Sequence, residues 1–282
     1  MRQRRSAWGW EISRLLVIGF VLSTARLAVA QGDEGFLRGM GHLDIALSYG
    51  LDTYDEFWIG DDKIDDAPFG RVTRQYVSLY AAYGLTDEID LGLNGSYVYV
   101  DTDHVFDDED ALQDLTTFAR VRLGSHRLGS ATLNVLAAPG IKVPMTHYED
   151  NSVTAVGDGQ VDLHLRGIVQ LVFDGGAYVA IETGYDFRFD SPPDEVPINF
   201  TGGFTFDRIT ISGFASRIES LGGYDIGEGP FPGVQEEYWR LGGGVYWRLT
   251  ESLGLTARGW TTLDGKNTGD VNGFSVGMVF RW

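Results

Sequence analysis

The feature that most constrains this chain is a two-residue alternation of apolar and polar side chains, which recurs in long segments through most of the sequence. In the segment 177–190, one phase is apolar or aromatic except for Thr183, and the other carries Glu182, Asp186 and Arg188. A repeat of two residues is that of a β-strand, because successive side chains of a strand point to opposite faces. The alternation therefore predicts an all-β protein made of two-faced strands.

Twelve segments carry this alternation, and most of them are long. A strand that crosses a bilayer needs about 9–11 residues, whereas strands of soluble proteins average about 5–6. The expected strands cover residues 40–51, 71–84, 89–100, 114–124, 130–143, 159–173, 177–189, 196–206, 208–219, 237–249, 253–264 and 271–282. Their length and number predict a closed, antiparallel, up-and-down transmembrane β-barrel of about 12 strands, with apolar side chains facing lipid and charged ones facing the lumen.

The connections between these segments alternate in length, as they do in outer-membrane barrels. Five are short, at residues 85–88, 125–129, 174–176, 207 and 250–252. Six are longer, at residues 52–70, 101–113, 144–158, 190–195, 220–236 and 265–270, and most are rich in Asp, Glu, Gly and Pro. Short periplasmic turns and long outer loops would place both termini in the periplasm of a Gram-negative cell. The acidic loops lack the ligand spacing and fixed glycine of a calcium loop, which favours solvated loops over cation sites.

The two ends of the chain fit an exported barrel. Residues 1–30 have the basic start, the apolar core and the Ala28-Val29-Ala30 site of a cleaved signal peptide, so the barrel domain would be residues 31–282. One phase of the last strand is apolar and ends on Trp282. Such a strand would invite aggregation unless it pairs with the first strand and closes the barrel. The expected partners are outer-membrane lipid and lipopolysaccharide, a small-molecule solute, and the barrel-assembly machinery, which would bind through this last strand.

Charge and cysteine content argue against nucleic-acid binding and against disulfide bonds. The chain has a formal net charge of −18, and removal of the arginine-rich residues 1–30 makes it more negative, so nucleic acid is not an expected partner. The absence of cysteine leaves stability to the sheet itself. No motif predicts a cofactor or a metal. The run Gly242-Gly243-Gly244 is not a phosphate-binding loop, since no helix follows it.

Several short motifs resemble a known family. Tyr83-Gly84-Leu85-Thr86-Asp87 followed by Leu91-Gly92-Leu93 is similar to the first periplasmic turn of the outer-membrane transporters named "putative meta-pathway of phenol degradation". Further matches, in the same order, are the segments 137–144, 157–159 and 273–277. The chain departs from the pattern at Met145-Thr146, where family members often carry Thr-Gly. The resemblance implies a 12-stranded outer-membrane β-barrel that passes small solutes, aromatic or apolar ones among them, and it carries over no catalytic residues.

The charged residues of the lumen phase are the candidate solute pathway. They are Arg74, Arg120, Arg122, Asp162, Arg166, Glu182, Asp186, Arg188, Arg240, Arg248 and Arg258. An arginine facing lipid at the midplane would cost about 2–4 kcal/mol, so a lumen position is required whatever the function. Two interpretations stay open: the charges pair and fill the interior, or unpaired arginines attract anionic or aromatic solutes.

Two functions that involve no catalysis are compatible with such a barrel. The first is a channel or transporter that lets small solutes pass passively through a narrow charged lumen, since twelve strands predict a bore smaller than that of the large porins. The second is a closed structural or surface-interaction barrel. The two differ in whether Arg166, Glu182, Arg240 and Arg258 pair with one another and seal the interior.

A third function, a barrel hydrolase, has weak support. It would use His104 beside Asp103, or His147 near Glu149, with the carboxylate orienting the imidazole as a general base. No Gly-x-Ser-x-Gly motif occurs, and Ser125-His126 falls in an expected periplasmic turn where no substrate would be held. We therefore expect a protein that is not an enzyme.

Overall fold

The computed structural model describes residues 35–65, 70–103, 106–148, 154–190, 192–229 and 233–282. The expected signal peptide, residues 1–30, and the first four residues of the expected barrel domain lie outside them. Within these ranges, no helix is both long and apolar enough to cross a membrane.

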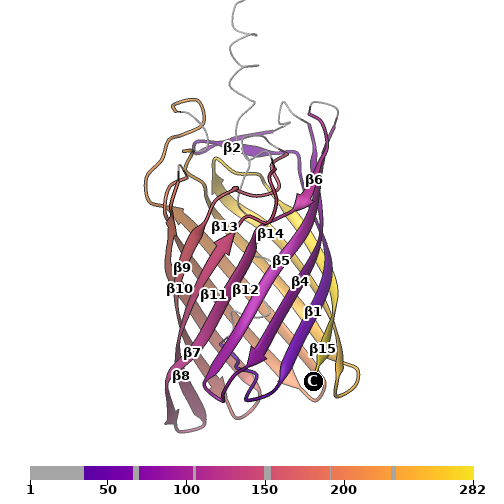
Figure 1. The fold of residues 1–282 in the computed structure, drawn as a ribbon, viewed down its shortest axis with the longest axis vertical. Coiled ribbons are helices and arrows are strands. Elements are labelled where there is room, and N and C mark those ends of the chain that lie inside the picture. The colour runs from indigo at the N-terminus through magenta and orange to yellow at the C-terminus, as the bar shows by residue number, and fades with distance from the viewer. Residues whose placement is uncertain (1–34, 66–69, 104–105, 149–153, 191, 230–232) are drawn as a thin grey trace, which may run out of the picture.

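In the described part of the chain, twelve long strands run up and down around one closed barrel, as the sequence predicts (Figure 1). They are β1 (Leu43–Tyr54), β4 (Val72–Gly84), β5 (Ile89–Thr102), β7 (Leu115–Leu128), β8 (Ala131–Val143), β9 (Asp162–Phe173), β10 (Ala177–Arg188), β11 (Glu195–Phe206), β12 (Ile209–Ser220), β13 (Glu237–Arg248), β14 (Leu253–Lys266) and β15 (Asn272–Arg281). Three short strands, β2 (Phe57–Ile59), β3 (Asp62–Ile64) and β6 (Glu109–Leu112), lie in the first two long connections. The short connections and the C-terminus lie at one end, the turn end, and the long connections lie at the other, the loop end (Figure 1).

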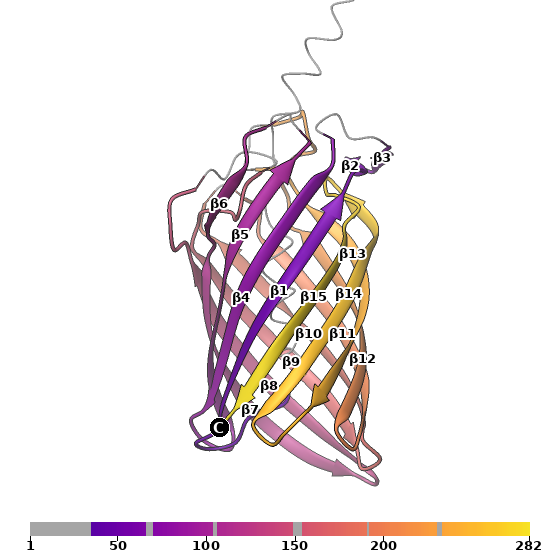
Figure 2. The ribbon, with the colours of Figure 1, turned by 90° about the vertical axis from the view of Figure 1, so that its right-hand side faces the viewer.

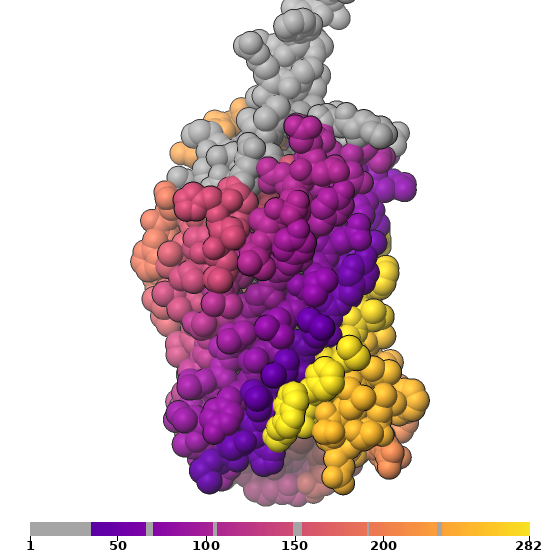
Figure 3. Space-filling view, turned by 45° about the vertical axis from the view of Figure 1, so that its right-hand side comes forward, coloured from indigo at the N-terminus to yellow at the C-terminus, as the bar shows by residue number. Residues whose placement is uncertain are grey.

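Pairing of the first strand with the last closes the barrel. β1 and β15 are antiparallel over ten residue pairs, from Asp44 opposite Arg281 to Thr53 opposite Asn272. The backbones of Leu43 and Trp282 also exchange two hydrogen bonds, of 2.9 and 3.0 Å. Figures 2 and 3 show the indigo first strand lying against the yellow last strand. The predicted closure is thereby confirmed, and the last strand has no unpaired edge.

The two faces of the strands separate as a membrane barrel requires. The apolar phase is outermost, where Val169 and Val179 are 44% and 51% exposed. The charged phase is innermost, where Gln170 and Arg240 are each 1% exposed. A soluble sandwich would show the reverse, because it buries its apolar faces against each other. The observed arrangement places hydrocarbon-compatible side chains outside and polar groups in the lumen.

Aromatic side chains in the lumen lie across glycines of neighbouring strands. A Cβ atom added to any of these glycines would collide with the aromatic ring on the residue opposite it; the pairs are Gly50 with Tyr76, Gly92 with Phe118, Gly203 with Tyr178 and Gly242 with Phe214. The ring covers the backbone that glycine leaves bare, a device that stabilises curved sheets. Glycine thus provides room for bulky rings in a narrow lumen, as well as easing curvature.

Several strand boundaries differ from the sequence prediction, and in β1 and β7 the backbone shows why. The first strand is Leu43–Tyr54 rather than 40–51, because Gly39 and Gly41 have positive φ of 82° and turn the chain before the strand begins. β7 continues to Leu128, so the predicted turn at 125–129 shrinks to Gly129 and Ser130, and Ser125 and His126 pair with β8. A bulge between Arg122 and Gly124 breaks the two-residue alternation there, which is why the sequence pattern ended early.

Candidate solute pathway

The residues predicted to line the lumen differ in how deeply they are buried. Seven are almost inaccessible: Arg74, Arg120, Asp162, Glu182, Asp186, Arg188 and Arg240. The side chain of Arg166 is 10% exposed, Arg122 and Arg258 are half-buried, and Arg248 is exposed at the turn end. They fall into separate groups along the barrel.

The middle ion cluster is built on β9, β10 and β11. Arg166 approaches Asp186 at two points, with Nη1–Oδ1 2.5 Å and Nη2–Oδ2 2.7 Å. His164 places Nδ1 2.6 Å from the same carboxylate. Glu182 lies 3.8 Å from Arg166 and accepts a 3.3 Å hydrogen bond from the side chain of Asn199. These groups share charge and hydrogen bonds, so this part of the lumen is held together rather than open for binding.

A second group, the loop-end ion cluster, surrounds Lys142 near the end of β8. Its ammonium group contacts the carboxylate of Asp158, lies 2.5 Å from that of Asp162 and lies 3.7 Å from that of Asp114. Arg188 extends the cluster, with contacts of 2.6 Å to Asp158. The ammonium group occupies the space that a cation among three aspartates would need.

The loop residues of this cluster have shifted pKa values. Burial raises the pKa of Asp114, although Lys142 opposes the shift. Burial also works to raise the pKa of Asp158, but Lys142 and Arg188 together hold it below its usual range. Tyr148, from the same loop region, donates its hydroxyl hydrogen to Asp114 and accepts a 3.0 Å hydrogen bond from the backbone of Gly159. The cluster therefore ties a long loop to the barrel wall.

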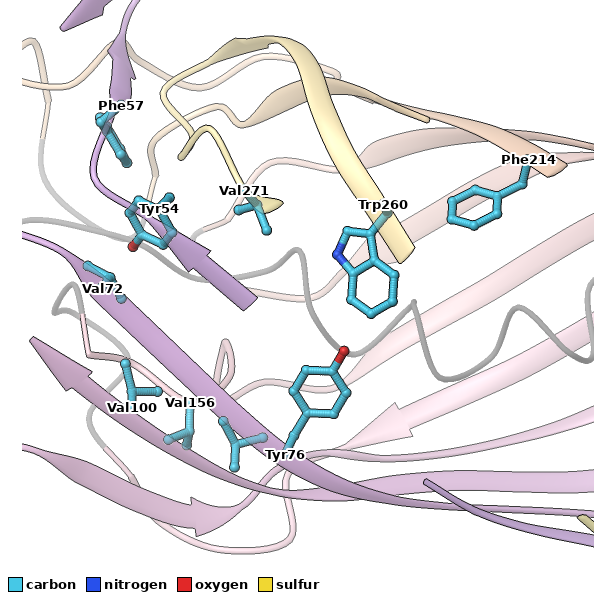
Figure 4. Packing of buried hydrophobic residues seen from close by; sticks show 10 residues of the cluster. Tyr54, Phe57, Val72, Tyr76, Val100, Val156, Phe214, Trp260 and Val271 are labelled. Carbon is cyan, nitrogen blue, oxygen red and sulfur yellow. The ribbon is translucent and has the colours of Figure 1, made fainter. Parts of the chain in front are cut away.

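An apolar cap fills the lumen at the loop end. It comprises Tyr54, Phe57, Val72, Tyr76, Val98, Val100, Val156, Phe214, Trp260 and Val271 (Figure 4). Tyr76 of β4 and Trp260 of β14 point toward one another in Figure 4. The Trp260 indole donates a 2.9 Å hydrogen bond to Asp52, and Arg74 donates one of 2.6 Å to the Ala155 carbonyl oxygen. Val156, brought in by a loop, is fully buried, so loop and wall together narrow this end.

The segment before β1 lies inside the barrel at the turn end, which the sequence pattern did not predict. Phe36 packs edge-to-face on Tyr178 of β10, with ring centroids 5.1 Å apart. Leu37 packs against a small lumen cluster of β8 and β9 residues that includes Leu136 and Ile168. The backbone N–H of Arg38 donates to Asp90. The segment has no two-residue alternation to mark it, because it is not a strand.

A cavity of about 330 Å³, the turn-end cavity, lies beside this segment. Its wall contains Phe36, Arg38, Asp44, Ala46, Tyr80, Tyr178, Thr205, Asp207, Arg208, Thr210, Ser212, Gly244, Val245, Tyr246, Arg248, Thr256, Arg258, Val279 and Arg281. Two of the predicted lumen arginines, Arg248 and Arg258, line it. Others of its arginines, such as Arg38 and Arg208, lie in segments outside the predicted strands or at their ends.

The four residues that distinguish a sealed barrel from an open one lie in different surroundings within the lumen. Arg166 and Glu182 lie in the middle ion cluster. Arg240 lies elsewhere, donating a 3.4 Å hydrogen bond to Thr262, and the Arg258 guanidinium lies 5.3 Å from the centre of the Phe214 ring. The middle of the lumen and its loop end are thus filled by paired charges and the cap, whereas the turn end holds a cavity.

Sequence reasoning missed Lys142, Asp114, Asp158 and the segment 35–38. Lys142 could have been found, because it has the lumen phase of its strand next to the outward-facing Ile141. Asp114 could also have been found, because it begins the expected strand 114–124 in the phase of Arg120 and Arg122, whereas the loop residue Asp158 gave no such signal.

The residues considered for a hydrolase do not form a site in the described ranges. His104 and Glu149 lie outside those ranges, so neither of the pairs Asp103–His104 and His147–Glu149 is described as a whole. Ser125 and His126 are exposed residues of a paired strand. Among the residues that the structure describes, no three His, Cys, Asp or Glu side chains are grouped so that they could hold a metal ion.

Comparison with known proteins agrees with this architecture. Residues 80–277, well over half of the chain, match the model of the family described as "Putative MetA-pathway of phenol degradation". The chain belongs to this family. The resemblance in its short motifs is thereby confirmed. A search of curated proteins found no sequence match.

Solved structures with a similar fold are barrels of the outer membrane. The COG4313 outer membrane channel from Pseudomonas putida F1 has a TM-score of 0.73 at 15% identity, covering 89% of this chain and 98% of that one. The translocator domain of the autotransporter NalP from Neisseria meningitidis has a TM-score of 0.51 at 14% identity, covering 98% and 96%. The NanC porin has a TM-score of 0.51 at 7% identity, covering 84% and 98%. This family member therefore has the β-barrel fold of outer-membrane channels and porins.

Proposed function

We propose that this protein is a passive outer-membrane channel for small solutes, aromatic or apolar ones among them. The observation that carries the proposal is the turn-end cavity, which combines aromatic and charged side chains inside a barrel whose outer surface suits lipid. The solute pathway would run along the predicted lumen residues, from Arg74 and Arg188 at the loop end to Arg248 and Arg258 at the turn end. No energy source is required for such passage.

The wider family and fold support this function. The matched family takes its name from phenol degradation, and the structure with a TM-score of 0.73 is named a channel. The apolar cap adds aromatic contacts that a phenolic or apolar solute could meet on its way through the lumen.

Reconstitution of the purified protein tests the proposal. In planar bilayers it should give small, voltage-independent conductance steps, and in liposomes it should speed the entry of phenol relative to an equally sized sugar. A closed structural barrel is the alternative, and the ion clusters of the middle and loop end favour it. If neither conductance nor faster phenol entry is seen, the channel proposal fails and this alternative takes its place.

We also propose that the turn end, with both termini, faces the periplasm, and that the last strand ending in Trp282 binds the assembly machinery. The chain has no cysteine, so single cysteines can be labelled without background. Glu228→Cys at the loop end should react with a membrane-impermeant maleimide on intact cells, and Glu251→Cys at the turn end should not. Both parent side chains are exposed, so the reverse result would invert the orientation.

A further inference from the structure

The charge of the turn-end cavity is opposite to that of the whole chain. Its wall contains five arginines, Arg38, Arg208, Arg248, Arg258 and Arg281, but only two acidic residues, Asp44 and Asp207. The chain as a whole has a formal net charge of −18. An excess of positive charge in one cavity of so acidic a protein does not follow from composition.

For four of these arginines, Arg38, Arg208, Arg248 and Arg281, the contacts supply less negative charge than the guanidinium groups carry. Asp44 lies 3.1 Å from Nε of Arg38 and 3.5 Å from Nε of Arg281, so one carboxylate serves two guanidinium groups. Arg248 and Arg208 donate to the backbone carbonyl oxygens of Asp207 and Leu249, which carry no net charge. The cavity therefore attracts anions and repels cations, and its partly enclosed position limits solvent screening.

Aromatic side chains make up the other part of the wall. Phe36, Tyr80, Tyr178 and Tyr246 line the cavity. The guanidinium of Arg281 lies 4.9 Å from the centre of the Tyr246 ring, so cationic and aromatic groups adjoin. The Tyr246 hydroxyl is buried and has no hydrogen-bond partner among the described residues. A flat ring with one polar, negatively charged end would match both kinds of wall.

We propose that the turn-end cavity is a binding site for an aromatic monocarboxylate. The guanidinium groups supply the two parallel N–H donors that a carboxylate accepts, and the aromatic residues supply the apolar contacts for the ring. A volume of about 330 Å³ is at the lower end of small-molecule sites and suits a single-ring compound. The inference rests on the proposed channel function in naming a class of solute, but binding at this site is measurable without transport.

Equilibrium binding of benzoate to the detergent-solubilised protein tests the proposal. Isothermal titration calorimetry should show one saturable benzoate site per chain, weakened by raised salt. Benzyl alcohol and benzylammonium, which keep the ring but lack the negative charge, should bind at least tenfold more weakly. Inorganic phosphate, which lacks the ring, should also bind at least tenfold more weakly. Equal binding of benzyl alcohol would overturn the role of the arginines, and equal binding of phosphate would overturn the role of the ring.

Substitutions locate the site. Arg258→Gln and Arg248→Gln should each weaken benzoate binding about tenfold, whereas Arg127→Gln, an exposed residue of a turn-end hairpin outside the cavity, should leave it unchanged. Arg258→Lys keeps the charge and tests the site if Arg258→Gln does not fold. Its affinity for benzoate should lie between that of the parent protein and that expected for Arg258→Gln. Unchanged benzoate binding in every cavity variant would show that benzoate does not bind in this cavity.

The outcomes separate this inference from the channel proposal. Saturable benzoate binding without conductance or solute entry would support the site and defeat the channel. Conductance and phenol entry without benzoate binding would support the channel and overturn the site.

Discussion

Arg166 on β9 and Asp186 on β10 form a two-point ion pair inside the barrel, with distances of 2.5 and 2.7 Å. The Asp186 side chain is fully buried, and His164 shares its carboxylate at 2.6 Å. In such surroundings a single charge left without its partner is costly, because water cannot replace the lost contact. Variants of this pair therefore show how much an ion pair in the lumen contributes to the free energy of unfolding of the barrel.

Removing one member of this pair should destabilise the barrel. Arg166→Gln or Asp186→Asn alone should lower the free energy of unfolding by about 3–5 kcal/mol, and the double variant should lose less than the sum of the two. Urea unfolding in phospholipid vesicles, followed by tryptophan fluorescence, measures this. The exposed pair Arg127 and Asp174 is the control, and Asp174→Asn should cost far less, because solvent screens an exposed ion pair. Additive losses would show that Arg166 and Asp186 do not interact.

A methyl group at Gly242 should disturb the lumen. Its Cβ would collide with the ring of Phe214 and lie 2.6 Å from the Gly259 carbonyl oxygen. We expect Gly242→Ala to lower the free energy of unfolding by about 1–3 kcal/mol in the same urea experiment, as overpacking does elsewhere. Gly124→Ala is the matched control, because a Cβ there meets nothing within 4 Å. Equal stability of the two variants would contradict the packing of Phe214 against Gly242.

Ionisation of Glu236, in the connection between β12 and β13, should destabilise the barrel. The free energy of unfolding should therefore fall as pH rises from about 4.5 to above 7. Burial raises the pKa of Glu236 to about 7, with the Thr268 hydrogen bond opposing the shift. When folding raises the pKa of an acid, its contribution to stability is fully present at pH values below the pKa in the unfolded state. That contribution is lost as pH rises through the pKa in the folded state. The loss at full ionisation is about 3 kcal/mol.

Substitution isolates this contribution. Glu236→Gln should be less sensitive than the parent protein when unfolding free energies at pH 5 and pH 8 are compared. Glu228→Gln, an exposed residue of the same connection, should keep the parent's pH dependence. An identical pH dependence in the Glu236 variant and the parent would rule out a raised pKa at this position.

The apolar cap should limit conductance. Replacing Tyr76 and Trp260 together by alanine removes two rings that point toward one another across the lumen, and single-channel conductance in planar bilayers should rise severalfold. Trp247→Ala removes an equally large ring from the outward face, where Trp247 is 50% exposed, and should leave conductance unchanged. An unaltered conductance in the double variant would place the narrowest point elsewhere in the lumen.

The sequence alone predicted the strands, their faces and the closure of the barrel. This was possible because a two-residue period is a local property, which fixes the face of each side chain without knowledge of its neighbours. Arg240 was expected in the lumen on that basis and is 1% exposed there. The period failed where the backbone departs from it, as at the bulge between Arg122 and Gly124.

Only the tertiary structure decided which lumen groups meet. Period two gives the face of a residue but not its height or its place around the barrel, which depend on strand tilt and register. Lys142 therefore joins Asp158, a loop residue with no periodic signal, and the segment beginning at Gly35 enters the lumen without being a strand. The turn-end cavity arises in the same way, because Arg38, Arg208 and Arg258 come from three distant parts of the chain that closure of the barrel brings to one wall.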